Sequence, residues 1–264
     1  MVKNSNLFTF NVSCTGTSHL REGKPCQDYS ACLNSDQMAI AAVADGHGGK
    51  IYFRSDRGAR FAVETAIECI EELITIKNTS IPKPIVSLKT LKKSIIAAWH
   101  KKIENDVRLD PINGDTTLPY GTTLLAAAIT GHYWFVIQIG DGKCVVIKKD
   151  GSISQPVPLD ESCFLNLTTS LCDEEADITF RYFYSETMPY AIFLGSDGLE
   201  NSFPINKNEE YLSFTYKSIY DNFMKEGFQN GESQLREMLP LLTQKGSGDD
   251  ISIAGIIRID KVKL

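Results

Sequence analysis

Hydrophobic and polar positions along the chain predict strands first, then two helices. Phe8 to Ser13 has the pattern of a strand, and Met38 to Ala44 is a continuous apolar run that predicts a buried strand. Residues 56–74 and 87–107 carry apolar side chains at a spacing of 3.6, which predicts two amphipathic helices. Ser87 is the expected N-cap of the second helix.

The second half of the chain predicts mostly strands, then two helices at residues 209–225 and 232–244, and a final strand. Helices placed between runs of antiparallel strands indicate an α+β fold in which helices cover sheet faces. Residues 155–176 have the least regular pattern, and we expect a surface flap there. The predicted strands are Thr122–Thr130, Tyr133–Ile139, Lys143–Lys148, Ile178–Tyr184, Tyr190–Leu194 and Ile251–Ile257.

Composition narrows the class of protein. The chain has 264 residues, of which 42% are hydrophobic, and we expect one catalytic domain over residues 1–264. Its net charge of −6 gives no general attraction to nucleic acid or anionic lipid, and it contains neither an apolar run of membrane-spanning length nor a signal peptide. Seven scattered cysteines without a Cys-x-x-Cys pair indicate reduced thiols. A cytoplasmic monomer is therefore expected.

Aspartates follow or precede the buried-type strands at several places. Asp45, Asp141 and Asp197 each come at the end of an apolar strand, and Asp249 and Asp250 precede the last one. Carboxylates brought together repel one another, and a bound cation removes that penalty. Because no histidine or cysteine cluster accompanies them, the set favours Mg²⁺ or Mn²⁺ over Zn²⁺. A single Asp-Gly at a strand end is usually just a turn, so the prediction depends on the ordered set.

That ordered set resembles the metal-dependent protein serine/threonine phosphatases of type 2C. The Gly23–Asp28 stretch is similar to the bacterial-type branch of this family. The resemblance implies a four-layer α-β-β-α sandwich, in which helix pairs flank two antiparallel sheets and the metals lie at one edge. The segments that carry the resemblance are Gln27-Asp28, Asp45–Gly49, Gly121–Thr123, Ile139–Gly142, Gly195–Leu199 and Gly248–Ile253.

By position, the resemblance implies two Mn²⁺ or Mg²⁺ ions and a weak third. It also implies that His47 is the general acid that protonates the leaving alkoxide. The implied metal site consists of Asp45 as the bridging ligand, the carbonyl of Gly46, Asp197, Asp249, Asp141 at the third ion, and Asp28 acting from behind the ligands or through water.

The phosphate-binding loop departs from the family pattern. Family members usually carry an arginine at the position of Gly23, so Arg21 or Lys24 would supply the cation instead, unless both are ordinary solvated charges. His19 lies in the same loop and is a further candidate for lining the phosphate site. Gln27 stands where the family often has glutamate, and adds no charge.

Two other departures affect the metal ligands. The last motif is usually Asp-Asn, and here it is Asp249-Asp250, so Asp249 is the expected ligand although either carboxylate could reach the metal after a small shift. Asn201 stands where the family often has a further aspartate, which weakens the third-metal prediction.

The resemblance implies hydrolysis of phosphoserine or phosphothreonine in a phosphorylated protein, by a water that bridges the metals. Two alternatives remain open from the sequence. The departures at Gly23 and Gln27 are also compatible with a regulatory binding module that has little turnover, since fold does not guarantee activity. The substrate could instead be a small phosphorylated metabolite.

Overall fold

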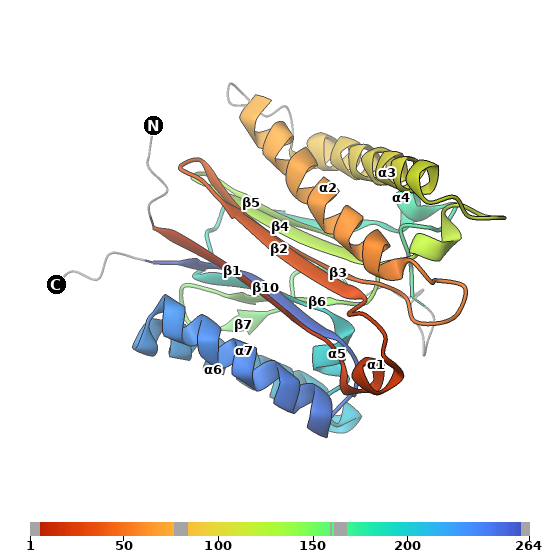
Figure 1. The fold of residues 1–264 in the computed structure, drawn as a ribbon. Coiled ribbons are helices and arrows are strands. Elements are labelled where there is room, and N and C mark those ends of the chain that lie inside the picture. The colour runs from red at the N-terminus through yellow and green to blue at the C-terminus, as the bar shows by residue number, and fades with distance from the viewer. Residues whose placement is uncertain (1–5, 77–83, 159, 161–167, 260–264) are drawn as a thin grey trace.

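The chain folds into four layers in the computed structural model, which describes residues 6–76, 84–158, 160 and 168–259. Two five-stranded antiparallel sheets face each other, and a pair of long helices covers the outer face of each (Figure 1). The expected α-β-β-α sandwich is confirmed.

The first sheet has the strand order β1-β10-β9-β6-β7 and joins both ends of the described chain. Strands β1 and β10, which are the first and last in the sequence, pair along their whole lengths, from Leu7 opposite Arg258 to Cys14 opposite Ile251. This sheet packs against helices α6 (Asn208–Glu226) and α7 (Phe228–Lys245) (Figure 1). Its strands are β1 Leu7–Cys14, β6 Lys143–Ile147, β7 Ile153–Ser154, β9 Ala191–Gly195 and β10 Ile251–Arg258.

The second sheet has the strand order β2-β3-β4-β5-β8 and packs against helices α2 (Ser55–Ile76) and α3 (Pro84–Leu109) (Figure 1). Hairpins connect β2 to β3 and β4 to β5, so neighbours in sequence are neighbours in space. Its strands are β2 Asp28–Asn34, β3 Met38–Asp45, β4 Leu124–Thr130, β5 Trp134–Ile139 and β8 Arg181–Ser185.

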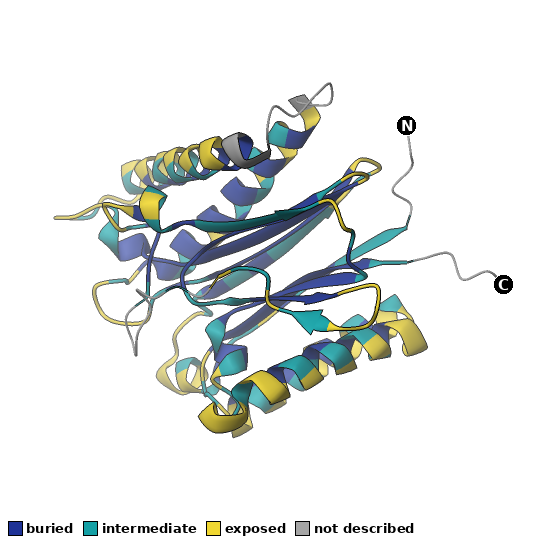
Figure 2. Cartoon of the chain, turned by 180° about the vertical axis from the view of Figure 1, so that it is seen from behind, coloured by how far each residue is buried: buried dark blue, intermediate teal, exposed yellow. Residues whose placement is uncertain are grey.

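Four long helices form the outer layers, and short helices sit at the strand ends. Figure 2 shows these helices buried on the sheet side and exposed on the other. Over the described residues, every helix is too short or too polar to span a lipid bilayer. The helices are α1 Thr17–Glu22, α2 Ser55–Ile76, α3 Pro84–Leu109, α4 Ala176–Thr179, α5 Asp197–Glu200, α6 Asn208–Glu226 and α7 Phe228–Lys245, with 3₁₀ turns Leu118–Tyr120 and Ile205–Lys207.

Strand β3 shows why the core has layers. Successive side chains of a strand point to opposite faces. Ile40 and Ala42 pack with α2 and α3, whereas Ala41 and Val43 pack between the two sheets. Both faces of β3 are therefore buried. This explains why the strand is a continuous apolar run, as expected of a buried strand.

Two local predictions are wrong. Helix α3 begins at Pro84, so Ser87 lies inside it rather than at its N-cap; proline at a first helical position has a backbone angle already suited to the helix. The segment predicted as a strand from Ile178 is helical as far as Thr179, because both backbone amides donate to the carbonyl of Glu175. The expected flap at 155–176 lies partly outside the described residues.

Candidate metal centre

Carboxylates from both sheets meet at one edge of the sandwich. Asp45, the last residue of β3, is the Cα partner of Asp28, the first residue of β2. In the other sheet, Asp197 is the first residue of α5 and lies two residues after the end of β9, and Asp249 lies two residues before β10, which pairs with β9. The turn between β5 and β6 adds Asp141, whose charge acts on Asp197. We call these five residues the carboxylate cluster.

The cluster is electrostatically strained. Burial, followed by the charges of neighbouring carboxylates, raises the pKa of Asp28 and Asp45 well above the usual range. Burial and the charges of Asp141 and Asp249 raise the pKa of Asp197 to about 6, although hydrogen bonds oppose the shift. Oδ2 of Asp28 is buried without a hydrogen-bond partner among the described residues. Such a group of carboxylates favours binding of cations.

The backbone around Asp45 is held by the Gly121–Thr123 motif. The amide of Asp45 donates to Thr123 Oγ1 at 3.0 Å, and the amide of Thr123 donates to the Asp45 carbonyl at 2.9 Å. The Thr122 hydroxyl donates to the same carbonyl at 2.8 Å. The motif carried part of the sequence resemblance, but its task of fixing Asp45 is visible only in the structure.

The two aspartates before β10 have different surroundings. Oδ1 of Asp250 accepts the amide of Gly16 at 2.6 Å, and its Oδ2 accepts the amide of Gln27 at 2.6 Å and His19 Nδ1 at 3.0 Å. Asp249 is hydrogen-bonded to the Asp250 amide through Oδ1, and its charge acts on Asp28 and Asp45. The geometry therefore favours Asp249 as the ligand, and this assignment stays a prediction.

His47 lies beside the cluster on the loop after β3. Burial lowers the pKa of its imidazole, and the charges of Asp141 and Asp173 act in the opposite direction. Its ring meets the edge of Tyr52, with centroids 5.0 Å apart. The side-chain amide of Gln27 braces this loop by donating to Ser55 Oγ at 2.6 Å and to the His47 carbonyl at 3.4 Å. Nothing in the sequence indicated that Asp173 lies near this histidine.

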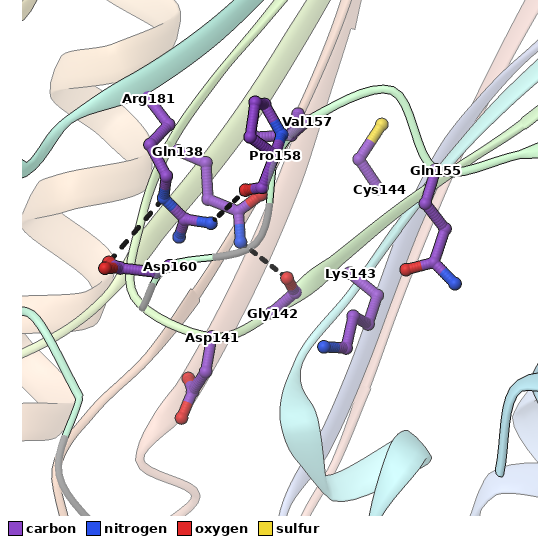
Figure 3. Close-up of a pocket in the computed structure, with 10 residues that line it drawn as sticks. All are labelled: Gln138, Asp141, Gly142, Lys143, Cys144, Gln155, Val157, Pro158, Asp160 and Arg181. Atoms are coloured by element: carbon purple, nitrogen blue, oxygen red, sulfur yellow. Dashed lines mark hydrogen bonds and ion pairs between the residues drawn. The ribbon is translucent and has the colours of Figure 1, made fainter. Parts of the chain in front are cut away.

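A small pocket opens beside Asp141, between the β5–β6 turn and the segment that follows β7 (Figure 3). Arg181, on edge strand β8, spans it by donating to the carbonyls of Pro158 and Gly140 and by pairing with Asp160 at 3.6 Å. This arginine therefore ties the beginning of the expected flap to the turn that carries Asp141.

No contact among the described residues links Arg21 or Lys24, the predicted phosphate-binding cations, to the carboxylate cluster. Arg21 is exposed on α1. Lys24 is exposed and forms an ion pair with Glu22, with Nζ and Oε2 at 2.6 Å. Both stay predictions. The Gly46 amide donates to the Gln27 carbonyl at 3.1 Å, so Gly46, whose own carbonyl is the proposed ligand, lies just beyond the paired ends of β2 and β3.

The residues fit divalent cations that keep water ligands. No three His, Cys, Asp or Glu side chains of the described chain converge tightly enough to form a coordination shell on their own. Mg²⁺ uses few carboxylates and retains several waters, so it does not need such a shell. An oxygen-only donor set of mutually repelling carboxylates suits Mg²⁺ or Mn²⁺, the more so because one oxygen of the buried Asp28 has no hydrogen-bond partner in the described part of the chain.

Similar proteins are found by family and by fold. Residues 15–240 match the family model described as Protein phosphatase 2C, whereas no curated protein sequence matches the chain. The catalytic domain of the serine/threonine protein phosphatase PstP, in complex with two manganese ions, superimposes with a TM-score of 0.61 at 17% identity over 97% of this chain and 99% of that one.

Two further bacterial structures are similar to the chain at 16% identity. Stp1 from Staphylococcus aureus superimposes with a TM-score of 0.61 over 98% of each chain. PppA, a regulatory component of the T6SS in Pseudomonas aeruginosa, superimposes with a TM-score of 0.62 over 96% of this chain and 98% of that one. At such identities the likeness shows the fold.

Proposed function

Because the chain belongs to the protein phosphatase 2C family of metal-dependent phosphoprotein phosphatases, we propose that it hydrolyses phosphoserine and phosphothreonine at the carboxylate cluster. The observation that carries this proposal is the meeting of five carboxylates from both sheets at one edge, with the pKa of Asp28 and Asp45 raised far above the usual range. Charge repulsion of this kind is relieved by the cations that the reaction needs.

We propose Asp45, the Gly46 carbonyl, Asp197 and Asp249 as the residues that hold two ions, with Asp28 acting behind them. Mn²⁺ or Mg²⁺, when bound, would lower the pKa of a coordinated water and neutralise charge on the phosphoryl oxygens. Manganese in the PstP structure supports this choice of ion. Asp141 would serve a third ion weakly, because Asn201 donates its amide to Asp197 Oδ2 at 2.8 Å and adds no charge.

His47 is the proposed general acid. A serine or threonine alkoxide leaves poorly unless it receives a proton as the ester bond breaks. The imidazole lies in the loop directly after Asp45 and is half-buried, so it could deliver that proton at the edge of the cluster. Tyr52 and the Gly121 carbonyl, which accepts the His47 amide at 3.0 Å, fix the position of this loop.

We further propose that residues 1–264 act as one catalytic domain, as a monomer in the cytoplasm, on phosphorylated proteins. Reduced thiols support a cytoplasmic location, because all six cysteines of the described chain are free. The helix pairs support a single domain, since both pack on sheets that share one interior between them.

The test is hydrolysis of a phosphoserine peptide by the purified chain and its Asp45→Asn variant, with Mn²⁺ and with EDTA. Turnover that disappears in EDTA and in the variant is expected. Asp36→Asn, an exposed carboxylate in the β2–β3 turn, is the matched control and should keep full activity. Full activity of Asp45→Asn would contradict the proposed site. Metal binding without turnover would indicate a binding module, and faster hydrolysis of small esters would indicate a metabolite substrate.

A further inference from the structure

His19 is held at the edge of the carboxylate cluster by a buried carboxylate. Its Nδ1 lies 3.0 Å from Oδ2 of Asp250, and the two side chains are 14% and 2% exposed. The short helix α1 that carries the ring is itself anchored, because the amide of Ser18 donates to the Gly248 carbonyl at 2.9 Å. Both the ring and its backbone are therefore fixed relative to the strand end that carries Asp249.

Asp250 holds the whole loop between β1 and β2. Its two oxygens accept the backbone amides of Gly16 and Gln27, each at 2.6 Å, at the two ends of that loop. An asparagine side chain has one oxygen and could accept at that atom only. The carboxylate of Asp250 adds charge repulsion to the neighbouring Asp249, and a basic side chain paired with Asp250 offsets that repulsion. His19 is that basic side chain.

The position of His19 agrees with the electrostatics of the cluster. Its charge lowers the pKa of Asp249, although burial and Asp250 raise that pKa on balance.

Four other basic side chains from neighbouring loops and strands each form an ion pair with a carboxylate outside the carboxylate cluster. These pairs are Lys24 with Glu22, Arg54 with Asp106, Lys143 with Glu200, and Arg181 with Asp160.

We propose that His19, oriented by Asp250, binds a phosphate oxygen of the substrate in the role that an arginine at position 23 would otherwise have. The inference rests on the proposed function. With Nδ1–H donated to Asp250, Nε2 is the ring nitrogen that remains for a ligand. With both ring nitrogens protonated, Nε2–H donates to a phosphate oxygen while Nδ1–H stays on Asp250. Asp250 is then a positioning residue.

The discriminating variant is His19→Asn, because the amide of asparagine can keep the donor to Asp250 while Nε2 is lost. The expected result is a protein that still folds and still binds Mn²⁺. The KM for a phosphoserine peptide, and the Kd of the Mn²⁺-loaded protein for inorganic phosphate measured by calorimetry, should both rise about tenfold to a hundredfold, the value of a charge-assisted hydrogen bond. His19→Arg should restore part of the phosphate affinity.

His132→Gln is the matched control, because this histidine is exposed in the β4–β5 turn. It should leave phosphate affinity unchanged. Wild-type phosphate affinity in His19→Asn would overturn the proposal, and so would a loss of affinity in Arg21→Ala or Lys24→Ala but not in His19→Asn. If the protein shows no turnover on any phosphopeptide, the proposed function fails, and a selective loss of phosphate binding in His19→Asn still upholds the phosphate site.

Discussion

Asp197→Asn should stabilise the metal-free protein while it impairs the metal-loaded one. In the folded chain the pKa of Asp197 is raised from 3.8 to about 6, mainly by burial and by the charges of Asp141 and Asp249. The folded carboxyl therefore holds its proton more tightly than the unfolded one. Stability is lost as the pH rises from about 4 to about 6, and the whole penalty is present at pH 8.

The magnitude follows from that shift. A pKa raised from 3.8 to about 6 corresponds to about 3 kcal/mol of destabilisation at pH 8. The substitution also disturbs the hydrogen bond that Asn201 Nδ2 donates to Asp197 Oδ2. Its loss reduces the gain in the free energy of unfolding by about 1 kcal/mol. A net gain of about 2 kcal/mol in EDTA should raise the melting temperature by roughly 4–8 °C.

The assay is thermal unfolding, followed by circular dichroism, of wild type, Asp197→Asn and the control Asp36→Asn. In EDTA at pH 8 the variant should be the more stable, and near pH 4.5 the difference should vanish, because the penalty that remains on the wild-type carboxyl, about 1 kcal/mol, then equals the value of the lost hydrogen bond. Saturating Mn²⁺ should reverse the order, because an ion at a hundred times its Kd adds about 2.7 kcal/mol to the protein that binds it. A variant less stable than wild type in EDTA at pH 8 would refute the reasoning, as would an advantage that persists near pH 4.5.

The remaining predictions concern the loop after β3. His47→Gln should lower turnover of a phosphoserine peptide about a hundredfold, but should change turnover of p-nitrophenyl phosphate far less, since that leaving group needs no proton; equal losses on both would exclude a general-acid role. Gly46→Ala should cost about 3 kcal/mol in chemical denaturation, because its Cβ would lie 2.6 Å from the Gln27 carbonyl oxygen and 2.7 Å from that of Ser55. Gly48→Ala should unfold like wild type, because a Cβ there meets no atom within 4 Å.

The glycines of the Asp45–Gly49 loop illustrate how far sequence reasoning reaches. The pattern indicated a sharp turn close to a ligand. In the structure, Gly46 is required by close backbone contacts and Gly49 by a φ of 113°, whereas neither reason applies to Gly48. Local composition predicts that such a loop needs glycine, but the particular position depends on which segments pack against it.

The phosphate-binding loop illustrates the opposite limit. The absence of an arginine at Gly23 was visible in the sequence, and Arg21, Lys24 and His19 were the available candidates. What distinguishes His19 is a contact with Asp250, which lies 231 residues away. A contact of that kind has no local pattern, because it is created when β1 and β10 pair and bring the two ends of the chain together.

The sequence alone determined the helices and strands of an α+β fold and the order of the aspartates at the strand ends, whereas the four layers were implied by the family resemblance. It could do so because the period of apolar residues reports directly on which faces of a helix or strand are buried. The tertiary structure decided which of those aspartates are strained and what holds them. Burial and electrostatic interaction arise only when the two sheets pack together. At the edge of the sandwich, β3 of one sheet and β10 of the other bring Asp45 and Asp249 close enough for their charges to interact.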